Sequence, residues 1–335
     1  MSEKSKPKFA MYWAASCGGC EIAVLNTHEK ILDIDANFDV VFWPVAMDAK
    51  YKDVEAMEDG SILLTLFNGG IRNAENAHMA KVMRAKSKIL VAFGSCAYEG
   101  CIPGLANFSS KEEIFDTAYS QREGGSTENP ENLRPQCSWQ MPEGEITIPE
   151  FYSYLRPLHH IVDVDYYMPG CPPESHQIAA VIDLVIQVLQ GKAELPPKGS
   201  VIGAGPSTVC DECKRTRNVK TITKFTRIQS ITADPELCLL EQGVICNGPA
   251  TRSGCGALCP AAGAVCIGCY GPAEGVVDYG ARLLSAVASV IDSNKPEEIE
   301  QILDGIQDPA GMFYRFSLAN SLLRFSKTAW QSNGK

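Results

Sequence analysis

The stretch Ser16-Cys17-Gly18-Gly19-Cys20-Glu21 lies directly behind a short apolar run, Phe9 to Trp13, and ahead of a helix-like segment, 21–30. This order indicates a strand, a loop and a helix. In an open α/β sheet, such a loop lies at the carboxyl edge of the strands, where ligands and cofactors bind. Two thiols three residues apart can hold a metal or form a redox disulfide. The stretch therefore predicts a functional centre as well as a fold.

The cysteine content favours metal ligands over disulfides. The 335 residues include 14 cysteines and show no secretory signal, because the apolar run behind Lys4, Lys6 and Lys8 is too short for a signal core. In a reducing cytosol, cysteines at CxxC spacing are typical metal ligands.

Charge and hydropathy exclude two classes of partner. The net charge of -10 argues against nucleic acid, which needs a basic surface. No stretch reaches the roughly 20 apolar residues of a membrane helix.

The first half of the chain alternates strand and helix patterns. A parallel, doubly wound, flavodoxin-like α/β sheet is the expected fold, because strands that alternate with helices form parallel sheets. Gly191 is the expected C-terminal cap of the last of these helices. Strands are predicted at 9–13, 38–43, 61–67, 88–93 and 161–168, and helices at 21–30, 73–85 and 175–190.

Four cysteines follow the ends of these strands. Cys17 and Cys20 follow the first strand, Cys96 follows a middle strand, and Cys171 follows the last. In a parallel sheet all of these positions lie at one edge. Four thiolates from three loops are what an iron–sulfur cluster with four cysteine ligands requires.

The segment 121–150 breaks the pattern. It is polar and rich in Gly, Pro, Asn and Glu, which predicts a surface insertion with Cys137 as a free thiol. Cys101 lies five residues after Cys96, a spacing that fits no ligand pair, so we expect a small packed residue there.

The second half is rich in cysteine. A linker with Pro196 and Pro197 divides the expected flavodoxin-like domain, 8–192, from an expected iron–sulfur domain, 193–335. Eight cysteines match two clusters of four, and the scarcity of large apolar residues suggests that metal supplies part of the stability. Because the segment has two CxxC pairs, a zinc ribbon is an alternative interpretation. The eight are Cys210, Cys213, Cys238, Cys246, Cys255, Cys259, Cys266 and Cys269.

Two helices are expected near the C-terminus, at 278–292 and 314–330. A polar turn with Asn294 and Pro296 separates them.

These motifs together resemble the small subunit of nickel–iron hydrogenases. The narrower resemblance is to cytoplasmic small subunits of methyl-viologen-reducing hydrogenases, which do not reduce deazaflavin and which associate with heterodisulfide reductase. The deazaflavin-reducing sister enzymes share much of the pattern. The matching pieces are Cys17-Gly-Gly-Cys20-Glu21, Gly94-Ser-Cys96-Ala97, Pro169-Gly-Cys171-Pro-Pro173, Val209-Cys-Asp-Glu-Cys213, Cys238-Leu-Leu-Glu-Gln-Gly243 and Gly248-Pro-Ala-Thr-Arg-Ser-Gly-Cys255.

The resemblance implies three 4Fe-4S clusters. Those periplasmic relatives that have a proline in place of Cys259 carry three irons at the medial position, so this thiol implies a four-iron cluster. The proximal ligands would be Cys17, Cys20, Cys96 and Cys171; the distal ligands Cys210, Cys213, Cys238 and Cys246; and the medial ligands Cys255, Cys259, Cys266 and Cys269.

The resemblance also implies partners and a role. The nickel–iron centre would lie on a large subunit, and electrons would leave to an iron–sulfur adaptor subunit and an FAD-bearing heterodisulfide reductase. Glu21 would either serve a proton path or act as an acid in the first turn of a helix, favoured by the helix dipole. Without a twin-arginine leader or a C-terminal anchor, a cytoplasmic location is expected. Gly18 and Gly19 separate the two thiols, which argues against a quinone reductase with adjacent cysteines.

Three functions are thus consistent with the sequence. The first is an electron relay to heterodisulfide reductase, and the second is an electron relay in a deazaflavin-reducing enzyme. The third is a zinc-stabilised binding module without redox function.

Overall fold

The computed structural model describes residues 6–120, 128–218 and 222–324. Its centre is a five-stranded sheet in the order β2-β1-β3-β5-β9, with every neighbouring pair parallel. This confirms the predicted doubly wound α/β fold. The strands are β1 (Lys8–Trp13), β2 (Asp39–Phe42), β3 (Ile62–Asn68), β5 (Ser87–Phe93) and β9 (Tyr166–Met168).

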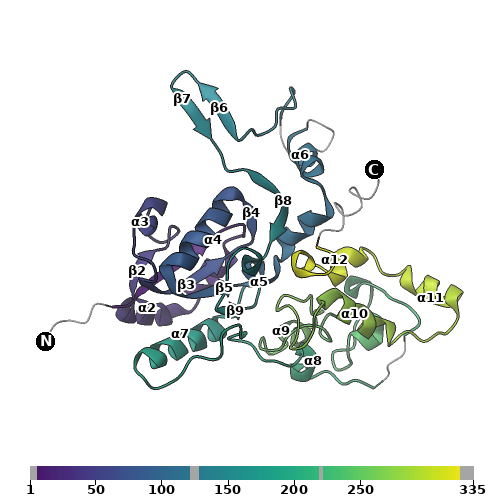
Figure 1. Ribbon diagram of the computed structural model, residues 1–335. Coiled ribbons are helices and arrows are strands. Elements are labelled where there is room, and N and C mark those ends of the chain that lie inside the picture. Colours follow the sequence, from purple (N-terminus) through teal and green to yellow (C-terminus); the bar gives the residue numbers. More distant parts are fainter. Residues whose placement is uncertain (1–5, 121–127, 219–221, 325–335) are drawn as a thin grey trace.

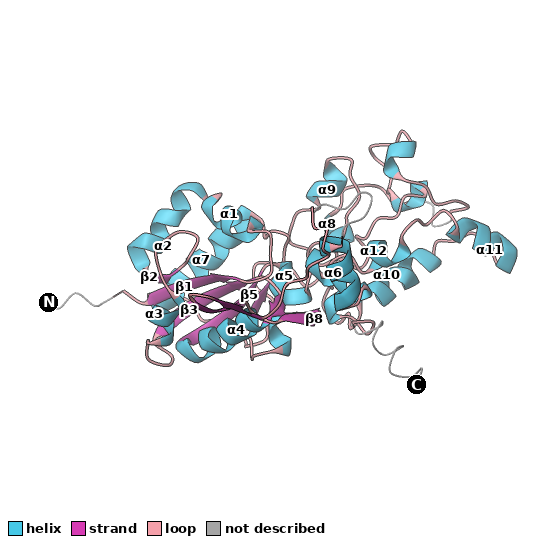
Figure 2. Cartoon of the chain, turned by 90° about the horizontal axis from the view of Figure 1, so that it is seen from above, coloured by secondary structure: helices cyan, strands magenta, loops and turns pink. Residues whose placement is uncertain are grey.

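Helices cover both faces of the sheet (Figure 2). On one face lie α1 (Gly19–Leu25), α2 (Ile31–Asn37) and α7 (Ser175–Leu189), and on the other lie α3 (Tyr51–Glu55) and α4 (Ala74–Lys86). Successive strand residues point to opposite faces. Phe9 and Met11 accordingly belong to the core under α7, whereas Ala10 and Tyr12 belong to the core over α4.

Two predicted elements of the sheet half differ from the structure. The helix expected at 21–30 ends at Leu25 and is followed by a 3-10 turn, His28–Lys30, and by α2. His28 has a φ of 55°, which a continuous helix does not allow. The strand expected at 161–168 is shorter, because only 166–168 pair with β5. The 3-10 turn Leu158–His160 lies before it.

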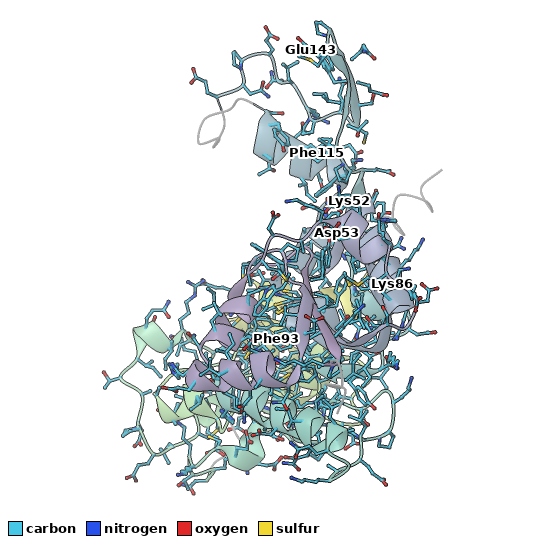
Figure 3. The ribbon with its side chains drawn as sticks, turned by 90° about the vertical axis from the view of Figure 1, so that its left-hand side faces the viewer. Lys52, Asp53, Lys86, Phe93, Phe115 and Glu143 are labelled. Carbon is cyan, nitrogen blue, oxygen red and sulfur yellow. The ribbon has the colours of Figure 1, made fainter. Side chains whose placement is uncertain are left out.

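The predicted insertion contains a β-hairpin that the sequence pattern did not indicate. Strands β6 (Ser138–Met141) and β7 (Gly144–Thr147) pair with each other, and every residue of both is exposed. The hairpin projects from the body, with Glu143 at its tip and Phe115 of α6 (Lys111–Tyr119) near its base (Figures 1 and 3). The expected surface position is therefore correct.

A second antiparallel pair lies beside the main sheet. Strand β4 (Ile71–Asn73) pairs with β8 (Phe151–Arg156), which carries the chain back from the insertion. Neither strand was predicted.

The connection between the two halves is not a free linker. Ile202 donates its N–H to the carbonyl of Tyr167 in β9 (2.8 Å), and Tyr167 donates to the carbonyl of Ser200 (3.1 Å). Because residues 200–202 run beside the last strand, they hold the second half against the sheet. The domain boundary at 192 and 193 stays a prediction.

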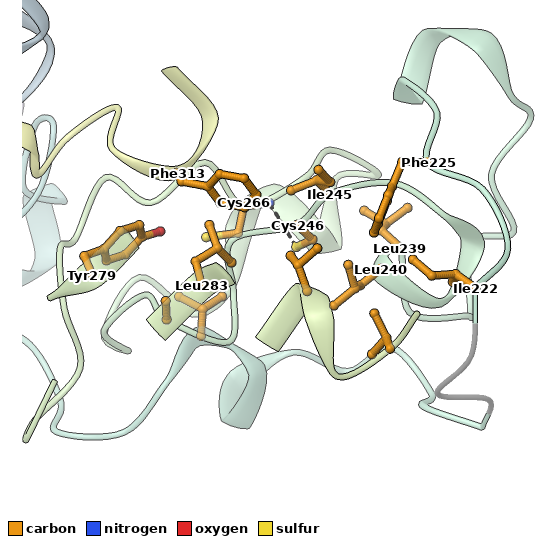
Figure 4. Close-up of a cluster of buried hydrophobic side chains, with 14 of the residues drawn as sticks. Ile222, Phe225, Leu239, Leu240, Ile245, Cys246, Cys266, Tyr279, Leu283 and Phe313 are labelled. Atoms are coloured by element: carbon orange, nitrogen blue, oxygen red, sulfur yellow. Dashed lines mark hydrogen bonds between the residues drawn. The ribbon is translucent and has the colours of Figure 1, made fainter. Parts of the chain in front are cut away.

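The second half is built from short helices and loops around a core of its own (Figure 4). Phe225, Leu239, Leu283 and Phe313 are buried there. The core combines residues of the cysteine-rich segment, 209–266, with residues 279–318 that follow it. That metal supplies part of the stability stays a prediction. Its helices are α8 (Val209–Glu212), α9 (Leu258–Ala261), α10 (Tyr279–Ala288), α11 (Pro296–Leu303) and α12 (Pro309–Phe313).

Helix α10 confirms the helix predicted at 278–292, with the Asp278 side chain accepting from the Ala281 N–H as its N-cap. Pro296 begins α11 instead of a turn. Up to residue 324 the predicted last helix is a 3-10 turn, Leu318–Asn320, and the remainder of that prediction lies outside the described residues.

The segment 316–320 returns to the sheet half. Cys101 donates its N–H to the carbonyl of Phe316 (3.0 Å), and Asn320 donates to the Glu99 carboxyl group (3.2 Å). Both contacts lie beside α5 (Ser95–Glu99), the short helix that follows β5. Among the described residues, no helix is long and apolar enough to cross a lipid bilayer.

Candidate iron–sulfur relay

The first group of thiols lies at the carboxyl edge of the sheet, where the sequence predicted it. Cys17 is in the loop after β1, Cys20 is in α1, Cys96 is in α5 after β5, and Cys171 follows β9. Cys20 and Cys96 are buried, and Cys17 and Cys171 are exposed. Burial raises the pKa of Cys20, and the nearby charges of Cys96, Glu21, Cys171 and Cys17 raise it further. The structure thus brings these four thiols together.

Backbone hydrogen bonds fix the positions of the cysteine-bearing loops of this group relative to one another. Gly94 donates to the carbonyl of Met168 (2.8 Å), and Ser95 donates its N–H to the carbonyl of Gly170 (2.8 Å). Gly94 has a φ of 81°, and a Cβ at this position would overlap the Cys20 sulfur. Only glycine lets the backbone approach that sulfur so closely.

Glu21 is buried beside the first group. Its Oε2 accepts a hydrogen bond from Asn68 Nδ2 (2.9 Å), and its Oε1 has no hydrogen-bond partner within the described part of the chain. Burial raises the pKa of Glu21. The side chain lies in the first turn of α1, so both sequence interpretations fit its position.

The second group lines a small apolar cavity whose walls include Cys210, Cys213, Cys238 and Cys246. Burial and then the charge of Cys246 raise the pKa of Cys210 to about 12. Gly248 borders the same cavity, and a Cβ there would lie 3.0 Å from the Cys210 sulfur.

Arg215 closes one side of this cavity. Its guanidinium donates to the carbonyls of Pro260 (2.9 Å), Asp234 (2.8 Å) and Leu237 (2.9 Å). These bonds fix the loop that carries Cys238.

The third group adjoins the other two. The pKa of Cys269 is raised to about 12 by burial, then by the charges of Cys255, Cys171 and Cys259. Cys266 donates its N–H to the Cys246 sulfur (3.4 Å), and the two side chains lie together in the core of this half (Figure 4). Cys269 therefore lies near the first group, and Cys266 lies against the second.

The donor chemistry of the three groups is uniform. Each consists of cysteine side chains, the set that iron–sulfur clusters use. Within the described ranges, no three or more His, Cys, Asp and Glu side chains are close enough to hold a single metal ion.

The two remaining cysteines differ in position. Cys137 is exposed at the base of the hairpin. Cys101 is buried, as expected of a packed residue, but its sulfur lies 3.6 Å from that of Cys171. The five-residue spacing from Cys96 gave no sign of this proximity. The S–H bond from Cys101 lowers the pKa of the Cys171 thiol.

Comparison with known proteins first identifies a protein family that the sheet half matches. The family profile described as "NADH ubiquinone oxidoreductase, 20 Kd subunit" matches residues 17–185. This stretch contains strands β2, β3, β5 and β9 of the sheet and the first group of thiols.

Relatives that match nearly the whole chain identify the protein family more closely. The iron–sulfur subunit of the F420-non-reducing hydrogenase of Archaeoglobus profundus is 42% identical over 323 residues, covering 94% of this chain and 97% of that protein. The corresponding subunit of the F420-non-reducing hydrogenase of Methanothermobacter marburgensis is 34% identical, covering 95% and 96%. A solved [NiFeSe] hydrogenase from Desulfovibrio vulgaris Hildenborough aligns with a TM-score of 0.49 and 17% identity, over 81% of this chain and 95% of that one.

The chain belongs to the iron–sulfur subunit family of F420-non-reducing hydrogenases, the electron-transfer small subunits of nickel–iron hydrogenases.

Proposed function

We propose that this chain carries electrons through three 4Fe-4S clusters between a nickel–iron large subunit and the electron acceptor of a hydrogenase complex. The observation that carries the proposal is the continuity of the thiol groups. Cys171 of the first group lies near Cys269 of the third, and Cys266 of the third lies against Cys246 of the second. This arrangement supports the order proximal, medial, distal.

The proposed ligand sets follow the three groups. The clusters, when bound, supply one-electron carriers. The proximal set is Cys17, Cys20, Cys96 and Cys171; the distal set is Cys210, Cys213, Cys238 and Cys246; and the medial set is Cys255, Cys259, Cys266 and Cys269.

The protein positions these sulfurs and tunes their charge. Buried thiols resist ionisation, as the raised pKa values of Cys210 and Cys269 indicate, so they need a compensating cation or donors. Backbone N–H groups supply part of that compensation: Cys266 N–H points at the Cys246 sulfur, and N–H groups of Ala257 and Leu258 point at Cys255. Such donors are one determinant of cluster potential.

Cys259 gives the medial set a fourth thiol. It is exposed at α9, and its charge contributes to the raised pKa of Cys269. A full 4Fe-4S cluster with four cysteine ligands is therefore our proposal for the medial position.

The surface around Cys17 is our proposal for the large-subunit interface. Trp13, Ile22 and Leu25 are exposed there, although all three are large and apolar. Trp13 contacts the Gly18 position, and Ile22 and Leu25 lie on α1 behind Cys20. Exposed apolar patches of this kind mark protein contacts. Beneath this surface, the buried Glu21 would hold a proton at its Oε atoms.

The acceptor side is part of the same proposal. An iron–sulfur adaptor subunit and an FAD-bearing heterodisulfide reductase would receive the electrons, in the cytoplasm. The alternative, a deazaflavin-reducing enzyme, is disfavoured because F420 is a deazaflavin and the relatives are named F420-non-reducing. A zinc-stabilised module without redox function is the third alternative.

Metal and flavin analysis of the native complex, purified without oxygen through a tag on this chain, tests the proposal. We expect roughly 12 irons from this subunit on three four-iron clusters, together with nickel and flavin from co-purifying chains. The Cys246→Ser variant should lose the distal cluster signal in electron paramagnetic resonance, whereas Cys137→Ser should keep all three. A colourless preparation with zinc would refute the relay, and iron without nickel would refute the hydrogenase partner.

A further inference from the structure

Cys101 places a fifth sulfur at the proximal group. Its side chain is 1% exposed, and its Sγ lies 3.6 Å from the Sγ of Cys171, with the S–H of Cys101 as donor. It packs with Cys96 and Phe316, and Cys269 of the medial group lies against the same cluster. The fifth sulfur therefore lies where the proximal and medial groups meet.

The position of Cys101 is held from several sides. Its φ is 50°, a conformation uncommon for a residue other than glycine. Such a conformation persists only where the surroundings determine it. Here the Cys101 N–H donates to Phe316 (3.0 Å) and its carbonyl accepts from the Gly104 N–H (2.9 Å). The backbone therefore holds this thiol against Cys171 instead of letting it turn away.

We propose that Cys101 donates an S–H hydrogen bond to the Cys171 sulfur, and so raises the reduction potential of the proximal cluster. The inference rests on the ligand set proposed above. Reduction adds negative charge, part of which falls on the ligand sulfurs. A donor at one of these sulfurs stabilises the reduced form more than the oxidised form, which raises the potential. Cys101 is thus a positioning and tuning residue, since it acts through Cys171.

Potentiometric titration of the whole complex, followed by electron paramagnetic resonance, tests this role. In Cys101→Ala we expect full iron content and a proximal potential shifted to lower values, with the medial and distal potentials unchanged. Cys101→Ser keeps a hydrogen-bond donor and should recover part of the shift. Cys137→Ala, which removes the other unassigned thiol, should shift nothing.

A second readout separates the hydrogen bond from packing. After exchange into D₂O, the proximal signal of the wild type should show coupling to a deuteron, and Cys101→Ala should lose it. An unchanged potential in Cys101→Ala, or loss of proximal iron in that variant, would overturn the tuning role. Cys171→Ala tests the ligand set separately: if the proximal signal survives there, the proposed ligands are wrong, whatever Cys101 does.

Discussion

The Ser95 hydroxyl donates a hydrogen bond to the backbone carbonyl of Cys269, across 174 positions of sequence. The same oxygen accepts the N–H of Gly170 (3.1 Å). One side chain beside Cys96 thus joins the loop before Cys171 to a residue of the medial group. Tyr270 adds a second link, because its hydroxyl donates to Gln177 of α7 and accepts from the Glu174 N–H (3.1 Å).

Ser95→Ala should destabilise the chain. The change leaves a buried N–H at Gly170 without its acceptor and removes the donor to Cys269, which costs about 1–3 kcal/mol. Urea unfolding, followed by circular dichroism and cluster absorbance, measures the loss. The control is Ser289→Ala, because that hydroxyl donates only to the nearby carbonyl of Ala286 at an exposed site. Equal unfolding free energies for the two variants would contradict the linking role.

Gly94→Ala should lose the proximal cluster. Its new methyl group would overlap the Cys20 sulfur, so that sulfur has to move. Gly263→Ala is the control because its φ of 83° is also positive, while nothing lies within 4 Å of the added carbon. Iron analysis should show a loss of roughly four irons per chain in Gly94→Ala only. If both variants lose iron equally, backbone strain is the cause and the close approach is irrelevant.

Glu99 should make stability depend on pH. Burial raises its pKa to about 8 from 4.5, so at pH 7 the folded chain keeps a proton that the unfolded chain releases. Between these two values the unfolded chain binds fewer protons, and stability therefore falls as pH rises, by ~1.4 kcal/mol per unit for a full proton.

Glu99→Gln removes this dependence and keeps an oxygen for the Asn320 donor. Between pH 6 and pH 8 the wild type should lose on the order of 2 kcal/mol relative to the variant. Urea midpoints at the two pH values measure the difference. Parallel pH profiles for the two proteins would show that Glu99 is already ionised in the folded chain.

Replacing the hairpin residues 138–147 by a short Gly-Ser turn should leave stability nearly unchanged, within about 0.5 kcal/mol. Every residue of β6 and β7 is exposed, so their removal uncovers no core. Phe151→Ala in β8 is the contrasting variant, since its ring lies 4.2 Å from the Arg72 guanidinium. It should cost at least about 1 kcal/mol. Thermal unfolding that drops sharply on hairpin removal would contradict this expectation.

Local patterns were enough to predict the main sheet and where its cysteines lie. Strands that alternate with helices predict a parallel order, and the ends of parallel strands meet at one edge. Cys17, Cys96 and Cys171 were therefore placed correctly without any knowledge of contacts. The hairpin was missed although Trp139, Met141 and Ile146 alternate with polar residues around Pro142 and Glu143, because the surrounding composition is that of a loop.

Local sequence patterns could not predict contacts between residues that are far apart in the sequence. The proximity of Cys101 to Cys171 depends on a backbone turn that Phe316 holds, and no spacing near Cys101 encodes a contact with the far end of the chain. The core of the second half could not be assembled from the sequence for a similar reason. Its buried residues, such as Phe225, Leu283 and Phe313, are scattered over about ninety positions and show no common period.

The return of residues 316–320 to the first half has a consequence for biosynthesis. A ribosome makes the sheet and its first thiols early, and N-terminal units generally fold first. Yet Cys101 is held by Phe316, and Glu99 receives its hydrogen bond from Asn320. The nascent chain therefore cannot complete the surroundings of its earliest cysteines until residues 316–320 have been made. A chain that stops short of this segment lacks those contacts and leaves the surroundings of its first thiols incomplete.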